Sequence, residues 1–206
     1  MILHVLQGSP NCRKTMATAY YLSRDVEMHY MELTSGETKS AEFLAINPNG
    51  LTPTLEDNDF KLWESEAVMQ YLADSGDENT LYPRDAKVRA DIDRWRFWGV
   101  AHYGRAVGDI LWEKFARKVF MGEETDPIAL ENALGRFHTY APILEKHLAG
   151  KKYLVGDAVT IADFSLACHA AYLQLSEVPM KEYPSINAWY DRLNGIPAWV
   201  DSAPKE

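Results

Sequence analysis

A short polar loop near the start of the chain carries residue types that can stabilise a sulfur anion. It reads Gly-Ser-Pro-Asn-Cys-Arg-Lys over residues 8–14 and follows the apolar run Ile-Leu-His-Val-Leu over residues 2–6. An apolar run, a Gly-x-Pro signal and a helical pattern predict a strand, a tight loop and a helix N-terminus. Backbone N–H groups and the positive end of the helix dipole then converge on one point. The loop is therefore predicted to hold an anionic group.

Three side chains of this loop are candidates for contact with a ligand's sulfur. The spacing Ser-Pro-x-Cys is that of the Cys-Pro-x-Cys loop of a glutaredoxin or thioredoxin, with serine replacing the first cysteine. The Ser9 hydroxyl can donate a hydrogen bond to a thiolate but cannot form a disulfide. The Asn11 amide is a second candidate. Cys12 is a third candidate: if it is exposed, its thiolate would be favoured beside Arg13, and otherwise it would face inward as a small apolar side chain. The choice among Ser9, Asn11 and Cys12 stays open.

Composition restricts the class of protein. The 206 residues are 47% hydrophobic, which suffices for one large domain or two smaller ones. A formal net charge of −9 argues against nucleic acid or an anionic membrane as a partner, because both need a basic face. The sequence lacks an apolar stretch of membrane-spanning length, a signal-peptide pattern and metal-ligand spacings. Two cysteines are too few for a disulfide scaffold, so a cytoplasmic protein with reduced thiols is expected.

The first third of the chain alternates between strand and helix patterns. The order is strand, helix, strand, helix, a hairpin of two strands, and helix, predicted over residues 2–7, 13–23, 26–33, 40–46, 54–56, 60–62 and 64–73. This βαβ–αββα order is the plan of a thioredoxin-like α+β domain. We place that domain at residues 1–76 and a linker at residues 77–85, where the sequence turns polar.

Residues 86–206 are predicted to form an all-α helical-bundle domain. Its clearest helical patterns cover residues 86–120, 127–148 and 184–194. The segment Thr-Ile-Ala-Asp at residues 160–163 has capping-box spacing, with aspartate in place of the usual glutamate or glutamine. The helix after it is apolar, so this cap is predicted to lie in the core and to serve folding.

Four motifs, in order, resemble those of the cytosolic glutathione S-transferase family. They are Ser-Pro-Asn-Cys-Arg-Lys at 9–14, Asn-Pro-Asn-Gly-Leu-Thr-Pro-Thr-Leu at 47–55, Leu-Trp-Glu-Ser-Glu-Ala-Val at 62–68 and Gly-Asp-Ala-Val-Thr-Ile-Ala-Asp at 156–163. The resemblance covers nearly the whole chain. The first loop is similar to that of bacterial members with a nu-class-like or phi/theta-like sequence.

This resemblance implies a cytoplasmic, homodimeric glutathione transferase that serves detoxification. Such an enzyme joins the thiolate of its co-substrate glutathione to small hydrophobic electrophiles and requires no metal. Two other functions stay open. The redox-like loop with Asn11 is compatible with a glutathione-dependent disulfide oxidoreductase or peroxidase, and the fold also suits a non-catalytic binding or stress-adaptor protein. The retained thiol loop and tripeptide motifs favour an enzyme.

The resemblance also assigns glutathione-binding roles to residues of this chain. Thr52 and Pro53 match a cis-proline position, where the backbone before the proline pairs with the cysteinyl part of glutathione. Glu64 and Ser65 match the γ-glutamyl site, with Ser65 and helix N–H groups on the carboxylate and Glu64 facing the ammonium. Lys39 matches a basic position that faces the glycyl carboxylate, although it could also be a solvated lysine.

Further residues are expected around the sulfur and the electrophile. Arg13 and Lys14 would add positive potential near the sulfur. The electrophile is expected to bind between the two domains, against an aromatic-rich helix. Its candidate contacts are Trp98, His102, Tyr103 and Trp112. Spacing by three or four residues along a helix is also typical of a packed core, which is the alternative for each of them.

Overall fold

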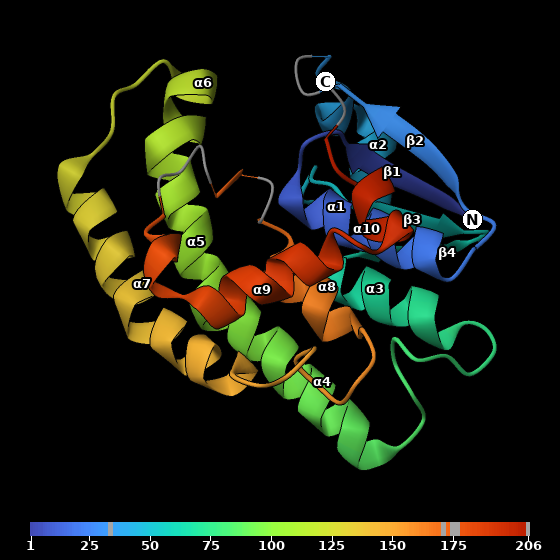
Figure 1. Cartoon of the computed structure of the whole chain (residues 1–206). Helices are drawn as coiled ribbons and strands as arrows, with labels where there is room; N and C mark the ends of the chain where they lie inside the picture. Colours follow the sequence, from blue (N-terminus) through green and yellow to red (C-terminus); the bar gives the residue numbers. More distant parts are fainter. Residues whose placement is uncertain (33–34, 170–171, 174–177, 205–206) are drawn as a thin grey trace. The chain divides into compact units, whose positions relative to one another are not determined.

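The computed structural model describes residues 1–32, 35–169, 172–173 and 178–204 (Figure 1). These residues form two compact units: Met1–Arg84 together with the segment that starts at Gly195, and Asp85–Asn194. The sequence placed residues 86–206 in one helical domain, so the assignment differs for the C-terminal segment. The predicted fold class, a thioredoxin-like domain followed by an α-helical domain, is confirmed.

The first unit is built on a mixed sheet with the strand order β2-β1-β3-β4. β1 pairs parallel with β2 and antiparallel with β3, and β3 pairs antiparallel with β4. The elements are β1 (Ile2–Leu6), α1 (Pro10–Tyr21), β2 (Glu27–Met31), η1 (Glu37–Lys39), α2 (Ala41–Ile46), β3 (Thr54–Asp57), β4 (Phe60–Trp63), α3 (Ser65–Asp74) and α10 (Pro197–Asp201). Their order up to α3 is the one predicted. The predicted end of the second strand, at residue 33, lies outside the described residues.

Helix α1 begins at Pro10, earlier than the predicted residue 13. Ser9 is its N-cap and accepts a hydrogen bond from the backbone N–H of Cys12 over 3.4 Å. Proline suits the first helical position, because its missing N–H has no partner there and its fixed φ fits the helix. Most of the loop at residues 8–14 therefore belongs to the start of α1.

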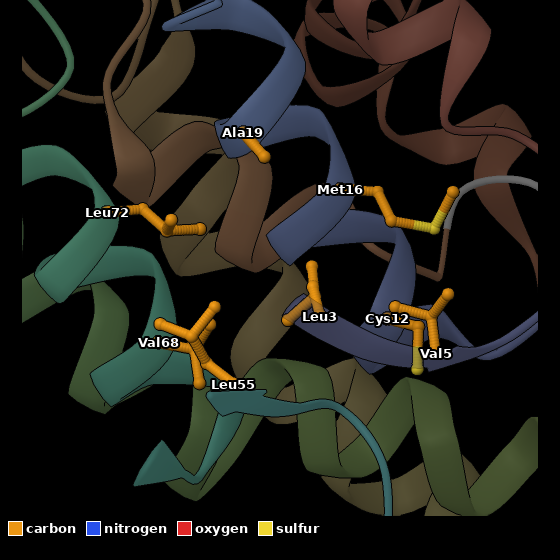
Figure 2. Close-up of a cluster of buried hydrophobic side chains, with 8 residues drawn as sticks. All are labelled: Leu3, Val5, Cys12, Met16, Ala19, Leu55, Val68 and Leu72. Atoms are coloured by element: carbon orange, nitrogen blue, oxygen red, sulfur yellow. The ribbon is translucent and has the colours of Figure 1, made fainter. Parts of the chain in front are cut away.

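The sheet, α1 and α3 enclose the core of the first unit. Figure 2 shows the buried cluster, which consists of Leu3, Val5, Cys12, Met16, Ala19, Leu55, Val68 and Leu72. β1 and β3 supply three of these side chains and the two helices supply the others. The first turn of α1 is thus anchored to packed apolar side chains, which limits the positions that the loop can take.

The C-terminal segment packs onto α1 through α10. The Arg13 guanidinium carbon lies 3.7 Å from the centroid of the Trp199 ring, and Arg13 Nη2 donates to the Trp199 carbonyl over 3.4 Å. The Trp199 side chain is only 1% exposed. Because Arg13 follows Cys12 in the first turn of α1, this cation–π contact supports the start of that helix.

Removal of the Trp199 ring tests this support. We expect Trp199→Ala to lower the free energy of unfolding by about 3 kcal/mol, through lost burial and a residual cavity. Chemical denaturation followed by circular dichroism measures the change. Trp112, which is 40% exposed, provides the control, and Trp112→Ala should stay within about 0.5 kcal/mol of the unmodified protein. A loss in Trp199→Ala as small as that expected for Trp112→Ala would mean that α10 does not stabilise the fold.

The described part of the second unit is helical. Its elements are α4 (Ala86–Trp98), η2 (Gly99–Tyr103), α5 (Gly104–Leu111), η3 (Trp112–Ala116), α6 (Arg117–Met121), α7 (Pro127–Leu148), α8 (Ile161–Ala167), η5 (Met180–Glu182) and α9 (Pro184–Leu193). The predicted helices over 127–148 and 184–194 correspond to α7 and α9. Among the described residues, no helix combines the length and apolar character needed to cross a bilayer.

The long helix predicted over residues 86–120 contains two π-helical segments, η2 and η3, that the sequence pattern did not indicate. Gly99 opens the first of them and lies against Leu166 of α8. A Cβ atom at position 99 would come within 2.5 Å of Leu166 Cδ1. Glycine at this position therefore allows α8 to approach η2 closely.

The predicted capping box forms the start of α8. Asp163 is fully buried and accepts hydrogen bonds from the backbone N–H groups of Leu154 and Thr160, the Thr160 hydroxyl and Trp189 Nε1, over 2.8–3.0 Å. Burial raises the pKa of Asp163, and these four donors act in the opposite direction. The prediction that this cap lies in the core is confirmed.

Candidate functional site

The loop between β1 and α1 holds Ser9 at the start of a helix. Gly8 makes the turn with a φ of 86°, and the Ser9 N–H donates to the Leu6 carbonyl over 3.2 Å. Ser9 Oγ accepts from the Cys12 N–H, and a hydroxyl that accepts one hydrogen bond keeps its own O–H as a donor. Because Ser9 is half-buried, this O–H can meet a ligand at the N-terminus of α1.

Cys12 points into the core and is 0% exposed (Figure 2). Its Sγ accepts from the Leu6 N–H over 3.3 Å and donates to Thr52 Oγ1 over 3.4 Å. Burial is the dominant influence and raises the pKa of Cys12, against hydrogen bonds with Thr52 and Ser9 that lower it. The geometry favours the inward-facing alternative for Cys12, in which its thiol ties the loop to Thr52.

The segment that leads to Pro53 is held by the buried side chain of Asn47. Its Nδ2 donates to the Leu51 carbonyl over 2.7 Å and to Thr54 Oγ1 over 3.0 Å. The Thr52–Pro53 peptide bond is cis, as the resemblance implied. Asn47 thus contacts the Leu51 backbone before this bond and the Thr54 side chain after it. Its role was not predicted, although the Asn-Pro-Asn-Gly sequence marked the turn.

The start of α3 lies beside the start of α1. Glu64, the N-cap of α3, has a φ of 72° and a ψ of 113°, a conformation that costs a non-glycine residue roughly 1–3 kcal/mol. The next residue, Ser65, donates through Oγ to Oδ1 of Asn11 over 3.5 Å. Such backbone strain is typical of positions held for function. The structure therefore brings Ser9, Asn11 and Ser65 to two neighbouring helix N-termini.

Lys39 lies on η1 and is exposed. Its Nζ donates to the carbonyls of Asn49 and Gly50 over 3.4 and 3.2 Å. These contacts place the ammonium beside the segment that leads to Thr52 and Pro53. A positive charge is thereby available next to the predicted tripeptide site.

The two basic residues expected near the sulfur are buried. Arg13 is 6% exposed and directed to Trp199, while Lys14 Nζ lies 2.8 Å from Glu66 Oε1 of α3. Loss of one partner from a buried ion pair typically costs about 3–5 kcal/mol. The Lys14–Glu66 pair was not predicted, since nothing in the sequence links two residues so far apart.

The second unit brings three of the four electrophile candidates together. The Trp98 ring stacks on the Tyr103 ring, with 6.0 Å between their centroids. The His102 ring centroid lies 6.3 Å from that of Trp98 and 4.8 Å from that of Tyr140. Tyr103 is fully buried, and its hydroxyl lies 3.0 Å from the Tyr190 hydroxyl. These contacts favour the core alternative for Tyr103. Trp112, in η3, is exposed.

Trp98 also lines a cavity of about 520 Å³ within the second unit, between α4 and α7. The other lining residues include Trp95, Ile143 and His147.

Within the described residues, no cluster of three or more His, Cys, Asp or Glu side chains is arranged to hold a metal ion.

Comparison with known proteins identifies the family. The family model described as "Glutathione S-transferase, N-terminal domain" matches residues 1–74, and the one described as "Glutathione S-transferase, C-terminal domain" matches residues 127–192. Both domains of one family thus occur in their usual order. The chain belongs to the glutathione S-transferase family.

Solved structures of this family are similar over nearly the whole chain. A delta-class glutathione transferase of Nilaparvata lugens is 27% identical, with a TM-score of 0.86 over 98% of this chain and 92% of that one. A glutathione transferase homologue of Lodderomyces elongisporus, solved with two GSH per subunit, is 28% identical, with a TM-score of 0.84 over 98% and 96%. A glutathione transferase of Phanerochaete chrysosporium in complex with oxidized glutathione is 26% identical, with a TM-score of 0.85 over 98% and 93%.

Proposed function

We propose that this protein joins the glutathione thiolate to small hydrophobic electrophiles. The observation that carries the proposal is the contact between Asn11 and Ser65, which sets the start of α1, with the Ser9 hydroxyl, beside the start of α3. Two helix N-termini at one point provide N–H donors and positive potential for an anionic ligand. Glutathione carries a carboxylate and an ionisable thiol that match these two positions.

The tripeptide then extends over four positions of the first unit. Ser65 and the first N–H groups of α3 hold the γ-glutamyl carboxylate, and Glu64 meets the ammonium. The backbone of Thr52, next to Pro53, pairs with the cysteinyl part. Lys39 faces the glycyl carboxylate. Relatives solved with glutathione bound support this choice of ligand.

Ser9 is the proposed donor to the sulfur, with Asn11 completing the loop and Cys12 supporting it from the core. A free thiol has a pKa of about 8.5, and lowering it by about two units requires ~2.7 kcal/mol. One charge-assisted hydrogen bond contributes about 1.5–3 kcal/mol, and a helix N-terminus adds about 1–2 kcal/mol. A hydroxyl and a helix end therefore suffice. The thiol proton leaves to water, and the thiolate attacks carbon as the leaving group departs.

Several further features belong to the proposal. The exposed side of the aromatic cluster at Trp98 and His102 contributes contacts for the electrophile, as does exposed Trp112. A homodimer would cover large apolar side chains that are exposed in one chain, among them Leu51, Phe60 and Phe97. The loop sequence suits a bacterial enzyme with a nu-class-like or phi/theta-like site. We place the protein in the cytoplasm, with a role in detoxification. A cytoplasmic location agrees with two buried cysteines that form no disulfide.

Turnover assays decide between the alternatives. We expect the purified protein to bind glutathione and to conjugate it to an activated aryl chloride faster than it reduces hydroxyethyl disulfide or a hydroperoxide. The reverse order of rates would favour the glutathione-dependent reductase. Glutathione binding without any turnover would favour a non-catalytic adaptor, and no binding at all would overturn the assignment of the ligand.

The role of Ser9 has its own test. We expect Ser9→Ala to raise the pKa of bound glutathione by about 1–2 units, as expected for the loss of one charge-assisted hydrogen bond. The conjugation rate at neutral pH should fall about 10-fold or more with little change in glutathione affinity. The ultraviolet absorbance of the bound thiolate, followed against pH, measures the pKa.

Two further variants separate this effect from capping, because Ser9 also caps α1. Ser9→Gly keeps an acceptable N-cap, at a cost of a few tenths of a kcal/mol, but has no hydroxyl. Ser9→Thr keeps both functions. The proposal requires that Ser9→Gly raise the pKa of bound glutathione as Ser9→Ala does, and that Ser9→Thr leave this pKa as it is in the unmodified protein. An unchanged pKa in Ser9→Gly would remove Ser9 from the chemistry.

A further inference from the structure

A buried ion pair joins the two helices whose first turns form the candidate glutathione site. Lys14 lies on α1 shortly after Cys12, and Glu66 directly follows Ser65 on α3. Lys14 Nζ and Glu66 Oε1 are 2.8 Å apart, and the two side chains are 4% and 15% exposed. The pair therefore lies inside the first unit and connects the elements that carry the proposed sulfur and γ-glutamyl contacts.

The position of Lys14 is costly, because burial of an ammonium group removes its hydration. Glu66 offsets part of this cost from the first turn of α3, where a carboxylate interacts favourably with the dipole. An anion bound at the start of α1 would offset more of it.

We propose that Lys14 stabilises the bound glutathione thiolate through space and that Glu66 sets the strength of this effect. The inference rests on the proposed function and deepens it. On ionisation the S–H bond breaks, the electron pair stays on sulfur and the proton passes to water. Lys14 provides positive charge behind the loop, while Glu66 holds the ammonium in place and cancels part of its charge. Both act as positioning residues without contact with the sulfur.

Burial raises the pKa of the Cys12 thiol, and the Lys14 charge is the smallest of the influences that act in the opposite direction. Other charged or titratable side chains on the neighbouring elements remain the same in the variants described below. They include His4, Cys12, Arg13, Tyr20, Tyr21, Glu56, Asp57, Glu64, Tyr71, Asp74 and Asp201.

Opposite shifts in two variants test the proposal. The bound thiol is titrated with glutathione itself, through the ultraviolet absorbance of the thiolate. Lys14→Met removes the cation and should raise the pKa of bound glutathione by about 1 unit. Glu66→Gln removes the anion, keeps a hydrogen-bond acceptor for Lys14, and should lower that pKa by about 0.5–1 unit. Lys14→Arg should stay close to the unmodified protein.

The sign of the shifts separates this role from a structural one. Loss of packing alone would move both variants in the same direction or leave both pKa values unchanged, and either result overturns the inference. The double variant Lys14→Met with Glu66→Gln should return toward the unmodified value. Where Lys14→Met fails to fold, Glu66→Gln and Lys14→Arg decide the question, since the inference requires a lowered pKa in the first and an unchanged one in the second.

A matched control uses the exposed pair Lys118 and Glu124, whose charged atoms are 3.0 Å apart. Lys118→Met and Glu124→Gln alter the net charge equally and should leave the pKa of bound glutathione unchanged. Calorimetry of the unmodified protein with glutathione identifies the source of a failure. Absent binding overturns the proposed function together with this inference, whereas binding with pKa shifts of one sign overturns the inference alone.

Discussion

Simultaneous Glu64→Ala and Ser65→Ala substitution is expected to weaken glutathione binding by about 1,000-fold or more. Each charge-assisted hydrogen bond contributes about 1.5–3 kcal/mol, and the two residues are proposed to meet both charges of the γ-glutamyl group. Loss of about 4 kcal/mol corresponds to this change in the dissociation constant. Isothermal titration calorimetry with glutathione measures it. Retained micromolar affinity would contradict the placement of the γ-glutamyl group at α3.

The control pair Ser75→Ala and Glu78→Ala has the same residue types after the C-terminal end of α3. Both positions are exposed, and glutathione affinity should stay within about twofold, as expected of surface substitutions away from a site. Loss of affinity in this control would indicate a general effect on α3 and not the loss of a binding site.

The strained backbone of Glu64 allows a sharper comparison. Glycine accepts a positive φ more readily than glutamate does, so Glu64→Gly relieves part of the strain and deletes the carboxylate at once. We expect Glu64→Gly to leave thermal stability nearly unchanged or to raise it, yet to bind glutathione at least 10-fold more weakly, the loss of about 1.4 kcal/mol. A Glu64→Gly variant with normal affinity would show that the strain serves the fold and not the ligand.

Local sequence signals predicted the parts of the site that local chemistry determines. The strand, loop and helix order around Ser9 was predicted, although Ser9 and Pro10 start the helix earlier than the predicted residue 13. The cis bond before Pro53 was implied by the family resemblance, and proline is the residue type that permits it. The spacing of Thr160 and Asp163 identified the buried capping box in the same way. Each feature depends on neighbouring residues, so a single sequence carries the information.

The features that were not predicted depend on distant residues. Lys14 and Glu66 are 52 residues apart, and Arg13 and Trp199 are 186 residues apart, so only the packing of α1 against α3 and α10 pairs them. The left-handed backbone of Glu64 carries no glycine signal. In each case a tertiary contact or strain fixed by the fold overrides the local pattern.

Substitution of the buried Asp163 tests whether the family motif at residues 156–163 serves folding or catalysis. Asp163→Ala leaves the donors of Leu154, Thr160 and Trp189 without their acceptor inside the protein. Each buried donor that loses its partner costs about 1–3 kcal/mol, so we expect a loss of about 5 kcal/mol in the free energy of unfolding. Denaturant titration of Asp163→Ala measures this loss.

Asp126→Ala is the matched comparison, because Asp126 also caps a helix and accepts backbone hydrogen bonds from Ile128 and Ala129. It is only half-buried, so its loss should be about 1 kcal/mol, the usual value for an N-cap. At low temperature, where the Asp163→Ala variant is still folded, we expect the pKa of its bound glutathione to equal that of the unmodified protein. The reason is that the capping box lies in the second unit and the proposed sulfur contacts lie in the first. An altered thiol pKa in the folded fraction would instead assign Asp163 a part in the chemistry.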